Sequence, residues 1–331
     1  MKKSFYRTGL LSAAHFAVDF SCAFLIYCRF LSASDLSLAI LLYNFCAFAL
    51  QLPIGILADY FRKPERFAGL GCILCAASYL IPIAIPAVII AGIGNALFHV
   101  GGGWEVMESS PEHAASLGVF VSPGAFGIYF GAILGERIFP FWLPPICLLA
   151  LCALCVVYRG EERKENPSGS ENADARYLVP ALLLFLVVVL RSYGGFAQVF
   201  DWKQGILAFA AVCATVLGKT AGGFLSDRFG LRISGAISLG ASALLFLLSR
   251  FAVAGLAAIF LFNLTMPMTL FALSKRMPDQ KGCSFGLLTF ALFLGFLPKY
   301  FGMQMPVPAG MLLCSVSLVS LAFYLPAVKR N

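Results

Sequence analysis

Two ionisable side chains lie unusually deep in the first apolar run of the sequence. His15 and Asp19 are four residues apart, so in a helix they share one face. Asp19 stands about ten residues into the run, which at about 1.5 Å per residue puts it roughly 15 Å deep, in the middle of a bilayer. A carboxylate at that depth costs several kcal/mol unless it faces a partner inside the protein. Asp19 and His15 could therefore carry protons or bind a ligand, and the alternative interpretation is a structural hydrogen bond or ion pair.

Arg191 is a cation at a comparable depth in a later apolar run, about thirteen residues from its start. We expect Arg191 and Asp19 to face each other. In that arrangement Arg191 would hold an anionic group of a ligand, and without ligand it would pair with Asp19 until protonation of Asp19 releases it. The structural alternative is a permanent buried salt bridge.

The remaining candidates are polar residues in other apolar runs. His99 carries an imidazole, which titrates near neutral pH and suits a proton relay, although a lone histidine can also be a satisfied core group. Lys219 could line a cavity or belong to the repeated loop described below, and Asn95 and Tyr193 are further candidates for substrate or proton coupling. The sequence shows no pattern of a catalytic, phosphate-binding, metal or cofactor site, so we expect neither enzyme activity nor direct ATP drive.

The elements that position these residues are predicted to be membrane-spanning helices. Hydrophobic residues make up 60% of the 331 residues and charged residues only 12%, far outside the range of a soluble domain. A spanning helix needs roughly 20 apolar residues, and the alternation typical of a membrane barrel is absent. We expect an all-α polytopic fold with twelve spans, at about 9–30, 36–58, 67–83, 87–104, 110–134, a sixth that ends near 158, 178–200, 206–225, 233–248, 254–273, 285–297 and 309–328. Ser110 and Pro111 are interpreted as the cap and first turn of the fifth span, and the eleventh could extend through Lys299.

A nine-residue stretch occurs twice and indicates two related halves. Residues 55–63 read Gly-Ile-Leu-Ala-Asp-Tyr-Phe-Arg-Lys, and residues 223–231 read Gly-Phe-Leu-Ser-Asp-Arg-Phe-Gly-Leu. The glycines allow helices to approach closely, and each aspartate stands at a span end where it can meet a neighbouring helix N-terminus or an arginine. We interpret the two copies as a conformational latch that consists of Gly55, Asp59, Arg62, Lys63, Gly223, Asp227 and Arg228.

The polar segment 159–176 separates a first six-helix half, 1–158, from a second, 177–331, and is predicted to be a cytoplasmic linker. With the N-terminus in the cytoplasm, 17 of the 24 Lys and Arg residues fall on the inner side. We therefore expect the protein to lie in the inner or plasma membrane, with both termini in the cytoplasm. The net charge of +8 then reflects anchoring to the inner leaflet, and no nucleic-acid partner is expected.

Glycines spaced by four form a smooth stripe in the fifth span. Gly127, Gly131 and Gly135 would let a neighbouring helix pack closely and slide during conformational change. The eleven cysteines lie mostly within apolar spans, where we interpret them as small hydrophobic residues.

The repeated pattern G-x-L-x-D-x-x-x-[RK] resembles the signature loop of the major facilitator superfamily, and with two six-span halves the resemblance covers the whole chain. Residues 15–19, 97–99, 190–193 and 218–223 resemble the fosmidomycin-resistance branch of its efflux transporters. Two positions depart from these patterns, because Val100 follows His99 where the branch has proline, and Leu231 ends the second copy of the loop. The resemblance implies a secondary transporter that works by alternating access between its two halves.

Within the spans, the cations Arg191 and Lys219 outnumber the carboxylate Asp19. This excess and the resemblance together favour proton-coupled efflux of a small organic anion or drug. We expect the protein to be a monomer. Uptake or facilitated diffusion of a metabolite is an alternative within the same class. An alternative from another class is a membrane sensor or assembly partner that does not transport, since fold does not fix function.

Overall fold

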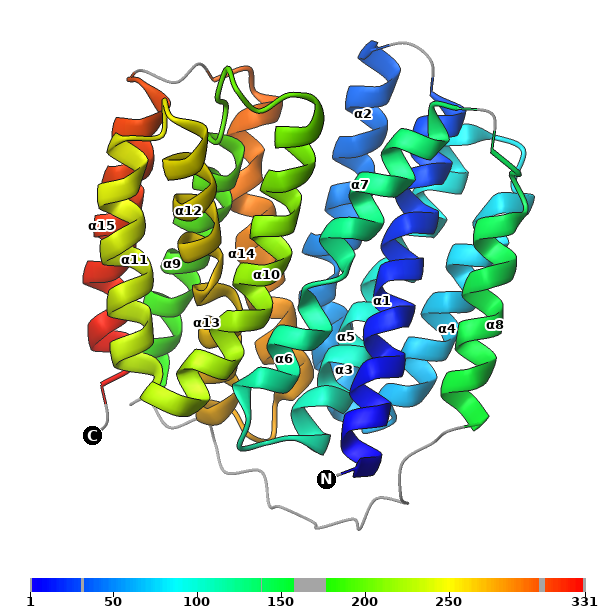
Figure 1. The fold of residues 1–331 in the computed structure, drawn as a ribbon. Coiled ribbons are helices and arrows are strands. Elements are labelled where there is room, and N and C mark those ends of the chain that lie inside the picture. The colour runs from blue at the N-terminus through cyan, green and yellow to red at the C-terminus, as the bar shows by residue number, and fades with distance from the viewer. Residues whose placement is uncertain (1, 31–32, 138, 158–176, 304–306, 330–331) are drawn as a thin grey trace. The chain divides into compact units, whose positions relative to one another are not determined.

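In a computed structural model of the chain, the described residues are 2–30, 33–137, 139–157, 177–303 and 307–329, and their regular structure is helical throughout (Figure 1). The predicted linker, 159–176, lies outside these residues. The α-helices are α1 (Lys2–Arg29), α2 (Ala33–Asn44), α3 (Gln51–Phe61), α4 (Pro64–Ala77), α5 (Ala84–Ser109), α6 (Ala114–Val121), α7 (Gly124–Gly135), α8 (Leu143–Val157), α9 (Leu178–Phe196), α10 (Gly205–Phe229), α11 (Leu231–Leu247), α12 (Ala252–Asn263), α13 (Thr265–Arg276), α14 (Lys281–Tyr300) and α15 (Ala309–Ala327). A π-helical turn, η1 (Phe45–Ala49), links α2 to α3, and a 3-10 turn, η2 (Ser78–Leu80), follows α4.

Three of the predicted spans each consist of two helices that run end to end. These are the pairs α2–α3, α6–α7 and α12–α13, so the fifteen described α-helices form twelve rods. Among the described residues, nine rods are long and apolar enough to cross a membrane, and α8 and α11 are shorter apolar helices. The eleventh rod, α14, continues through Lys299. This agrees with the longer of the two ends predicted from the sequence for this span.

A proline lies at each of the three breaks. Pro53 and Pro267 stand in the first turns of α3 and α13, and Pro123 immediately precedes α7. Proline lacks an N–H group and its ring clashes with the carbonyl four residues earlier, so an undistorted helix cannot continue through it. At the first break the chain forms a π-turn, in which the Leu50 N–H donates to the Phe45 carbonyl at 3.3 Å.

Ser110 and Pro111 do not begin a helix, so that prediction is wrong. Ser110 follows the last residue of α5, and α6 begins only at Ala114. The cap of α6 comes from a distant part of the chain, because the Asp227 carboxylate accepts hydrogen bonds from the N–H groups of Ala114 and Ala115 at 2.7 and 3.0 Å. A local serine is therefore not needed there.

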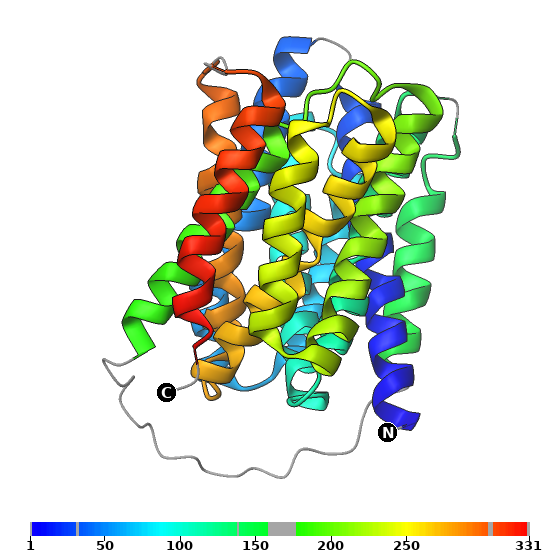
Figure 2. The ribbon, with the colours of Figure 1, turned by 60° about the vertical axis from the view of Figure 1, so that its left-hand side comes forward.

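Contacts divide the chain into two compact units that do not follow chain order. Unit 1 comprises Met1–Pro111, Val119–Asn172 and Pro278–Phe290, and unit 2 comprises Glu112–Gly118, Ala173–Met277 and Ala291–Asn331. The division therefore falls inside α6 and α14. Within unit 1, α1 packs along α7 and α4 along α5 (Figure 1). Within unit 2, α11 packs against α15 and α12 (Figure 2).

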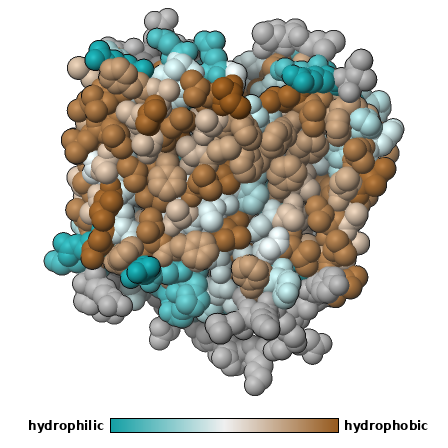
Figure 3. Space-filling view, in the orientation of Figure 1, coloured by the Kyte–Doolittle hydropathy of each residue, from teal (hydrophilic) through white to brown (hydrophobic). Residues whose placement is uncertain are grey.

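Each unit is apolar both inside and on its lateral surface. Phe24, Phe98 and Phe120 are fully buried in unit 1, as are Leu239 and Phe246 in unit 2. On the face seen in Figure 3, apolar side chains cover the middle of the helices in each unit, and hydrophilic side chains gather toward the helix ends. Helices with apolar outer surfaces and internally satisfied main chains suit a lipid environment.

Candidate functional site

Four buried polar side chains from two helices meet in unit 1. We refer to His15 and Asp19 of α1, together with Asn95 and His99 of α5, as the His–Asp cluster. These residues are between 2% and 7% exposed. The two residues on each helix are one turn apart, so both pairs point from a single helix face.

Asp19 contacts each of the other three side chains in the cluster. Its Oδ1 accepts a hydrogen bond from Asn95 Nδ2 at 2.8 Å and lies 3.7 Å from His99 Nε2. Its Oδ2 lies 3.2 Å from His15 Nε2. The two imidazoles also meet directly, with 2.8 Å between their Nε2 atoms. The cluster can therefore hold or pass a proton among a carboxylate and two imidazoles.

Main-chain groups fix the orientation of both imidazoles. His15 Nδ1 lies 2.7 Å from the Phe120 carbonyl oxygen of α6, and His99 Nδ1 lies 2.8 Å from the Asn95 carbonyl oxygen. Gly124, the first residue of α7, leaves room for the cluster, because a Cβ at that position would overlap both Asp19 Oδ2 and the His15 ring. Tertiary packing thus surrounds the cluster from α1, α5, α6 and α7.

The cluster offers three ligand atoms, from His15, Asp19 and His99, within 4.8 Å of one another, an arrangement that could hold a metal ion. A tetrahedral zinc ion with bonds of about 2.0–2.1 Å holds two nitrogens about 3.3 Å apart. The two Nε2 atoms are 2.8 Å apart, which is a hydrogen-bond distance. The geometry therefore fits a proton between the rings better than it fits zinc.

Arg191 is buried on α9 in unit 2 and is 6% exposed. Its Nη2 donates to the Phe262 carbonyl at 3.3 Å, and its guanidinium carbon lies 5.3 Å from the centre of the Phe262 ring. Within the described part of unit 2, its Nε has no hydrogen-bond partner and no carboxylate forms an ion pair with it. A buried guanidinium with a spare donor can bind an anion. Because Arg191 and Asp19 belong to different units, their expected pairing stays a prediction.

Tyr193 and Lys219 are the other predicted coupling residues in unit 2. Tyr193 is half-buried on α9, with its ring centre 6.2 Å from that of Phe196, and Lys219 is half-buried on α10. The coupling roles of both residues stay predictions.

The two repeated loops have the same geometry. In unit 1 the Asp59 carboxylate accepts hydrogen bonds from the N–H groups of Gly282 and Cys283, at 2.8 and 2.7 Å, in the first turn of α14. In unit 2 the Asp227 carboxylate does the same for the first two residues of α6. Each carboxylate satisfies N–H groups that lack intrahelical partners and interacts favourably with the helix dipole. From the sequence, we considered a helix N-terminus or an arginine as the partner of these aspartates. In the structure, both aspartates accept hydrogen bonds from a helix N-terminus.

The glycine one turn before each aspartate allows this close approach. A Cβ on Gly55 would overlap the backbone of Gly282, and a Cβ on Gly223 would overlap the backbone of Ala114. Both loops then turn through a residue with positive φ, which is Arg62 (φ 52°, left-handed) in the first copy and Gly230 (φ 80°) in the second. The other two predicted latch cations, Lys63 and Arg228, are exposed.

An ion pair stands beside each latch aspartate. Lys281, the first residue of α14, pairs with Glu108 in unit 1, and Lys275 pairs with Glu112 at 2.5 Å in unit 2. The hydrogen bond from the Lys275 ammonium lowers the pKa of the Glu112 carboxyl. Our sequence interpretation included neither pair, because the partners are more than 160 positions apart.

The glycine stripe of α7 lies directly against α1. A Cβ on Gly127, Gly131 or Gly135 would lie against a main-chain carbonyl of α1, which belongs to Phe16, Phe20 and Phe24 respectively. The two helices therefore approach closely along the whole stripe. Sliding along this contact, as the sequence suggested, stays a prediction.

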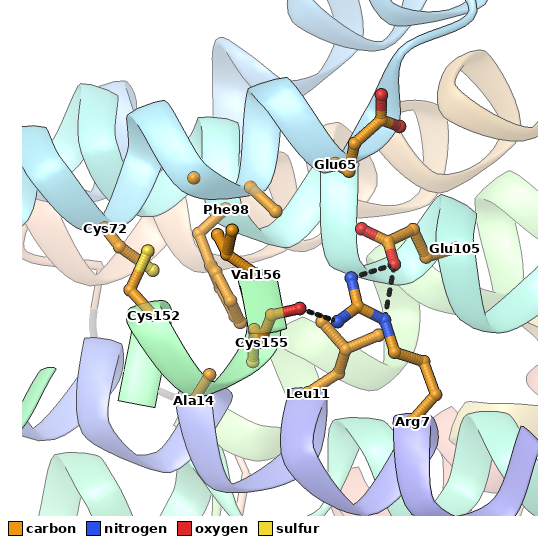
Figure 4. Close-up of a pocket in the computed structure, with 12 residues that line it drawn as sticks. Arg7, Leu11, Ala14, Glu65, Cys72, Phe98, Glu105, Cys152, Cys155 and Val156 are labelled. Atoms are coloured by element: carbon orange, nitrogen blue, oxygen red, sulfur yellow. Dashed lines mark hydrogen bonds and ion pairs between the residues drawn. The ribbon is translucent and has the colours of Figure 1, made fainter. Parts of the chain in front are cut away.

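A buried ion pair that sequence reasoning missed joins three helices of unit 1. Arg7 of α1 is 8% exposed and donates from Nε to Glu105 Oε2 of α5 at 2.8 Å (Figure 4). Its Nη1 donates to the Cys155 carbonyl of α8. The same residues line a small cavity together with Glu65 and Cys72. A buried pair of this kind mainly fixes the relative position of the helices, because breaking it would leave one charge uncompensated.

Comparison with known proteins identifies the family and the fold. A family model described as the Major Facilitator Superfamily matches residues 5–298. No curated protein matches the sequence. A solved structure of FucP in the outward conformation aligns with a TM-score of 0.71 and 14% identity, covering 99% of this chain and 100% of that chain. A structure of a variant of the E. coli fucose:proton symporter FucP aligns with a TM-score of 0.70 at the same identity and coverage. At this identity the likeness shows the fold alone, and the predicted all-α fold of the major facilitator type is confirmed.

Proposed function

The chain belongs to the major facilitator superfamily, and we propose that it exports small organic anions in exchange for protons. Members of this family are carriers and not enzymes, so the chain is a multi-pass membrane transporter of a small molecule. Beyond membership of this family, the proposal states the negative charge of the substrate, the coupling ion and the direction of transport. Alternating access between two halves around a central site is the mechanism that this fold supports.

The environment of Arg191 is the single observation that carries the proposal. The guanidinium is buried, its Nε lacks a hydrogen-bond partner among the described residues, and its Nη2 is held by a neutral carbonyl. A buried cation without a counter-charge is costly, and a bound phosphonate or carboxylate would supply both the charge and the missing acceptor. The substrate is therefore proposed to be a small anion.

The His–Asp cluster supports proton coupling. The cluster brings a carboxylate and two imidazoles, which bind and release protons, into direct contact, and polar groups inside a membrane protein commonly serve this purpose. Binding of a proton to the cluster in unit 1 and of an anion to Arg191 in unit 2 would bias alternating access in opposite senses. That arrangement would couple the two fluxes.

Efflux and orientation rest on the sequence. The excess of Lys and Arg in the loops assigned to the inner side supports cytoplasmic termini. The four short stretches that resemble the fosmidomycin-resistance branch support efflux of a phosphonate-like anion. The second candidate function is uptake of a metabolite with protons, which the symporter named in one structural comparison favours.

The test of the proposal is anion binding by Arg191→Gln, which removes the charge and keeps a donor. Isothermal titration calorimetry on the purified protein would use small phosphonates, carboxylates and sugar phosphates. We expect a loss of about 2–3 kcal/mol in binding free energy, or roughly 30- to 150-fold in Kd.

Arg250→Gln is the matched control for this substitution. Arg250 is an exposed arginine whose guanidinium carbon lies 4.6 Å from the centre of the Phe251 ring, so the control also removes a cation from an aromatic face. Its anion affinity should equal that of the unmodified chain. Equal affinity in all three proteins would refute Arg191 as the anion site.

A further inference from the structure

Three contacts of the two imidazoles, two with main-chain carbonyls and one between the rings, decide which ring nitrogens carry hydrogen. His15 Nδ1 is 2.7 Å from the Phe120 carbonyl oxygen, His99 Nδ1 is 2.8 Å from the Asn95 carbonyl oxygen, and the two Nε2 atoms are 2.8 Å apart. A carbonyl oxygen only accepts hydrogen bonds, so both Nδ1 atoms must carry hydrogen.

Two neutral imidazoles have too few N–H groups for these three contacts, because each contact needs one donor. A neutral imidazole carries one N–H group, and both such groups are used at the Nδ1 atoms. Two Nε2 lone pairs would then face each other at 2.8 Å. The other tautomer only moves the conflict, because an unprotonated Nδ1 would face a carbonyl oxygen. A third proton, carried by one Nε2 and donated to the other, satisfies all three contacts.

The Asp19 carboxylate supplies the negative charge that balances an imidazolium. Protonating Asp19 would not remove the repulsion between the two Nε2 lone pairs. A protonated Asp19 carboxyl could donate to one Nε2, and the contact between the rings would still join two acceptors. The ionised carboxylate lies 3.2 Å from His15 Nε2 and accepts a hydrogen bond from Asn95. The ionised form therefore fits the observed contacts, and the protonated form does not.

In the part of the chain that the structure describes, no lysine or arginine forms an ion pair with Asp19. The other titratable groups that interact with Asp19 are the Tyr43 hydroxyl of α2 and the Cys75 thiol of α4, with the Cys22 thiol of α1 beside them. None of these three side chains can carry a positive charge. On the remaining side, α6 and α7 present the Phe120 carbonyl and Gly124. Among the described residues of unit 1, the cation that balances Asp19 is therefore the imidazolium.

We propose that His15 and His99 share one proton between their Nε2 atoms, with Asp19 ionised as its counter-charge. The inference rests on the proposed function, in which the cluster carries the coupled proton, and it assigns that proton to the imidazole pair instead of the carboxylate. When the proton leaves, the two lone pairs repel at 2.8 Å, so the contact between α1 and α5 opens at this point. Proton release would thereby move one helix against the other.

The test is nitrogen-15 NMR of the full chain in lipid bilayers, labelled at histidine. The chain contains three histidines, so a His113→Gln background leaves the His15–His99 pair as the sole source of imidazole signals. The His113 side chain is 68% exposed and lies 3.8 Å from the Asp227 carboxylate, outside the His–Asp cluster. Samples would be treated with a chelator and measured near neutral pH with and without added Zn²⁺.

We expect both Nδ1 atoms to carry hydrogen and one further proton to couple to both Nε2 nitrogens across the hydrogen bond. Chelator treatment should leave this signal unchanged. Only two ring protons in total, or a protonated Asp19 carboxyl, would overturn the proposal. Nε2 signals that respond to stoichiometric Zn²⁺ by losing the shared proton would overturn it as well, because they would assign these atoms to a metal ion.

His99→Gln in the same background tests the count independently. The glutamine amide can donate to His15 Nε2 without an extra proton, so His15 should become a neutral ring with hydrogen at Nδ1. An imidazolium at His15 in this variant would show that Asp19 binds the proton through one ring alone, and would overturn the shared bridge.

This measurement does not require transport, so the two proposals can fail separately. A shared proton without pH-driven flux in proteoliposomes would refute the proposed function and leave the proton assignment in place. Flux that follows the pH gradient without a shared proton would refute the assignment alone.

Discussion

The aspartates of the two repeated loops show how single residues join distant helices. Asp59 accepts two N–H groups at the start of α14, and Asp227 accepts two at the start of α6. A carboxylate has two equivalent acceptor oxygens, whereas asparagine has one acceptor and two donor hydrogens that would face the helix N–H groups. Replacing either aspartate by asparagine therefore removes one of the two acceptor oxygens and places donor hydrogens against the helix N–H groups.

We expect Asp59→Asn to speed the solvent exchange of the Gly282 and Cys283 N–H groups. Losing a hydrogen bond to a charged acceptor costs about 1.5–3 kcal/mol, so local opening should increase roughly tenfold or more. Hydrogen–deuterium exchange with mass spectrometry measures this directly. Asp227→Asn is the matched control, since it should leave these two groups protected and expose the first turn of α6. Unchanged exchange at Gly282 and Cys283 in Asp59→Asn would contradict this account of the latch.

Residue spacing predicted only part of the candidate site. His15 and Asp19 are one turn apart, so the sequence alone indicates that they share a helix face. His99 lies on another helix, and only tertiary packing brings its ring to 2.8 Å from that of His15. The buried pair of Arg7 and Glu105 could not be predicted, because the partners are 98 positions apart and Arg7 follows a basic start of the chain.

Helices were predictable as apolar runs, but their breaks and ends depend on other signals. The breaks before α7 and within the α2–α3 and α12–α13 rods each carry a proline that is visible in the sequence, and our interpretation did not use it. The start of α6 is different, because its cap is Asp227, 113 positions after Ala114. Local sequence signals cannot show a cap that tertiary structure supplies.

The contact between α1 and α7 gives a prediction about helix packing. We expect Gly131→Ala to destabilise the protein by about 1–3 kcal/mol, because the added methyl would lie against the Phe20 carbonyl of α1. Thermal unfolding of the purified protein, followed by tryptophan fluorescence, measures the effect.

Gly9→Ala is the control within α1, since a Cβ there meets nothing within 4 Å. It should leave the midpoint unchanged or raise it slightly, because alanine favours a helix over glycine by up to about 1 kcal/mol. Equal midpoints for Gly131→Ala and Gly9→Ala would show that the stripe does not limit the approach of the two helices.

For the whole molecule, composition predicted a membrane protein and the repeated loop predicted its family, and both conclusions are confirmed. The contact units could not be predicted. Pro278–Phe290 belongs to unit 1 because Asp59 and Gly55 contact the first turn of α14, and the sequence does not show that contact. The substrate, the coupling ion and the direction of transport remain proposals at this scale, and flux across a membrane tests them together.

The most direct test of the central claim is anion flux into proteoliposomes under an imposed pH gradient. The proteins compared would be the unmodified chain, Arg191→Gln, Asp19→Asn and the control Arg250→Gln. We expect the unmodified chain and the control to move a small phosphonate or carboxylate only with the gradient. Arg191→Gln should abolish the flux, and Asp19→Asn should uncouple it from the gradient because the shared proton loses its counter-charge. Flux that ignores the gradient and survives both substitutions would contradict the account.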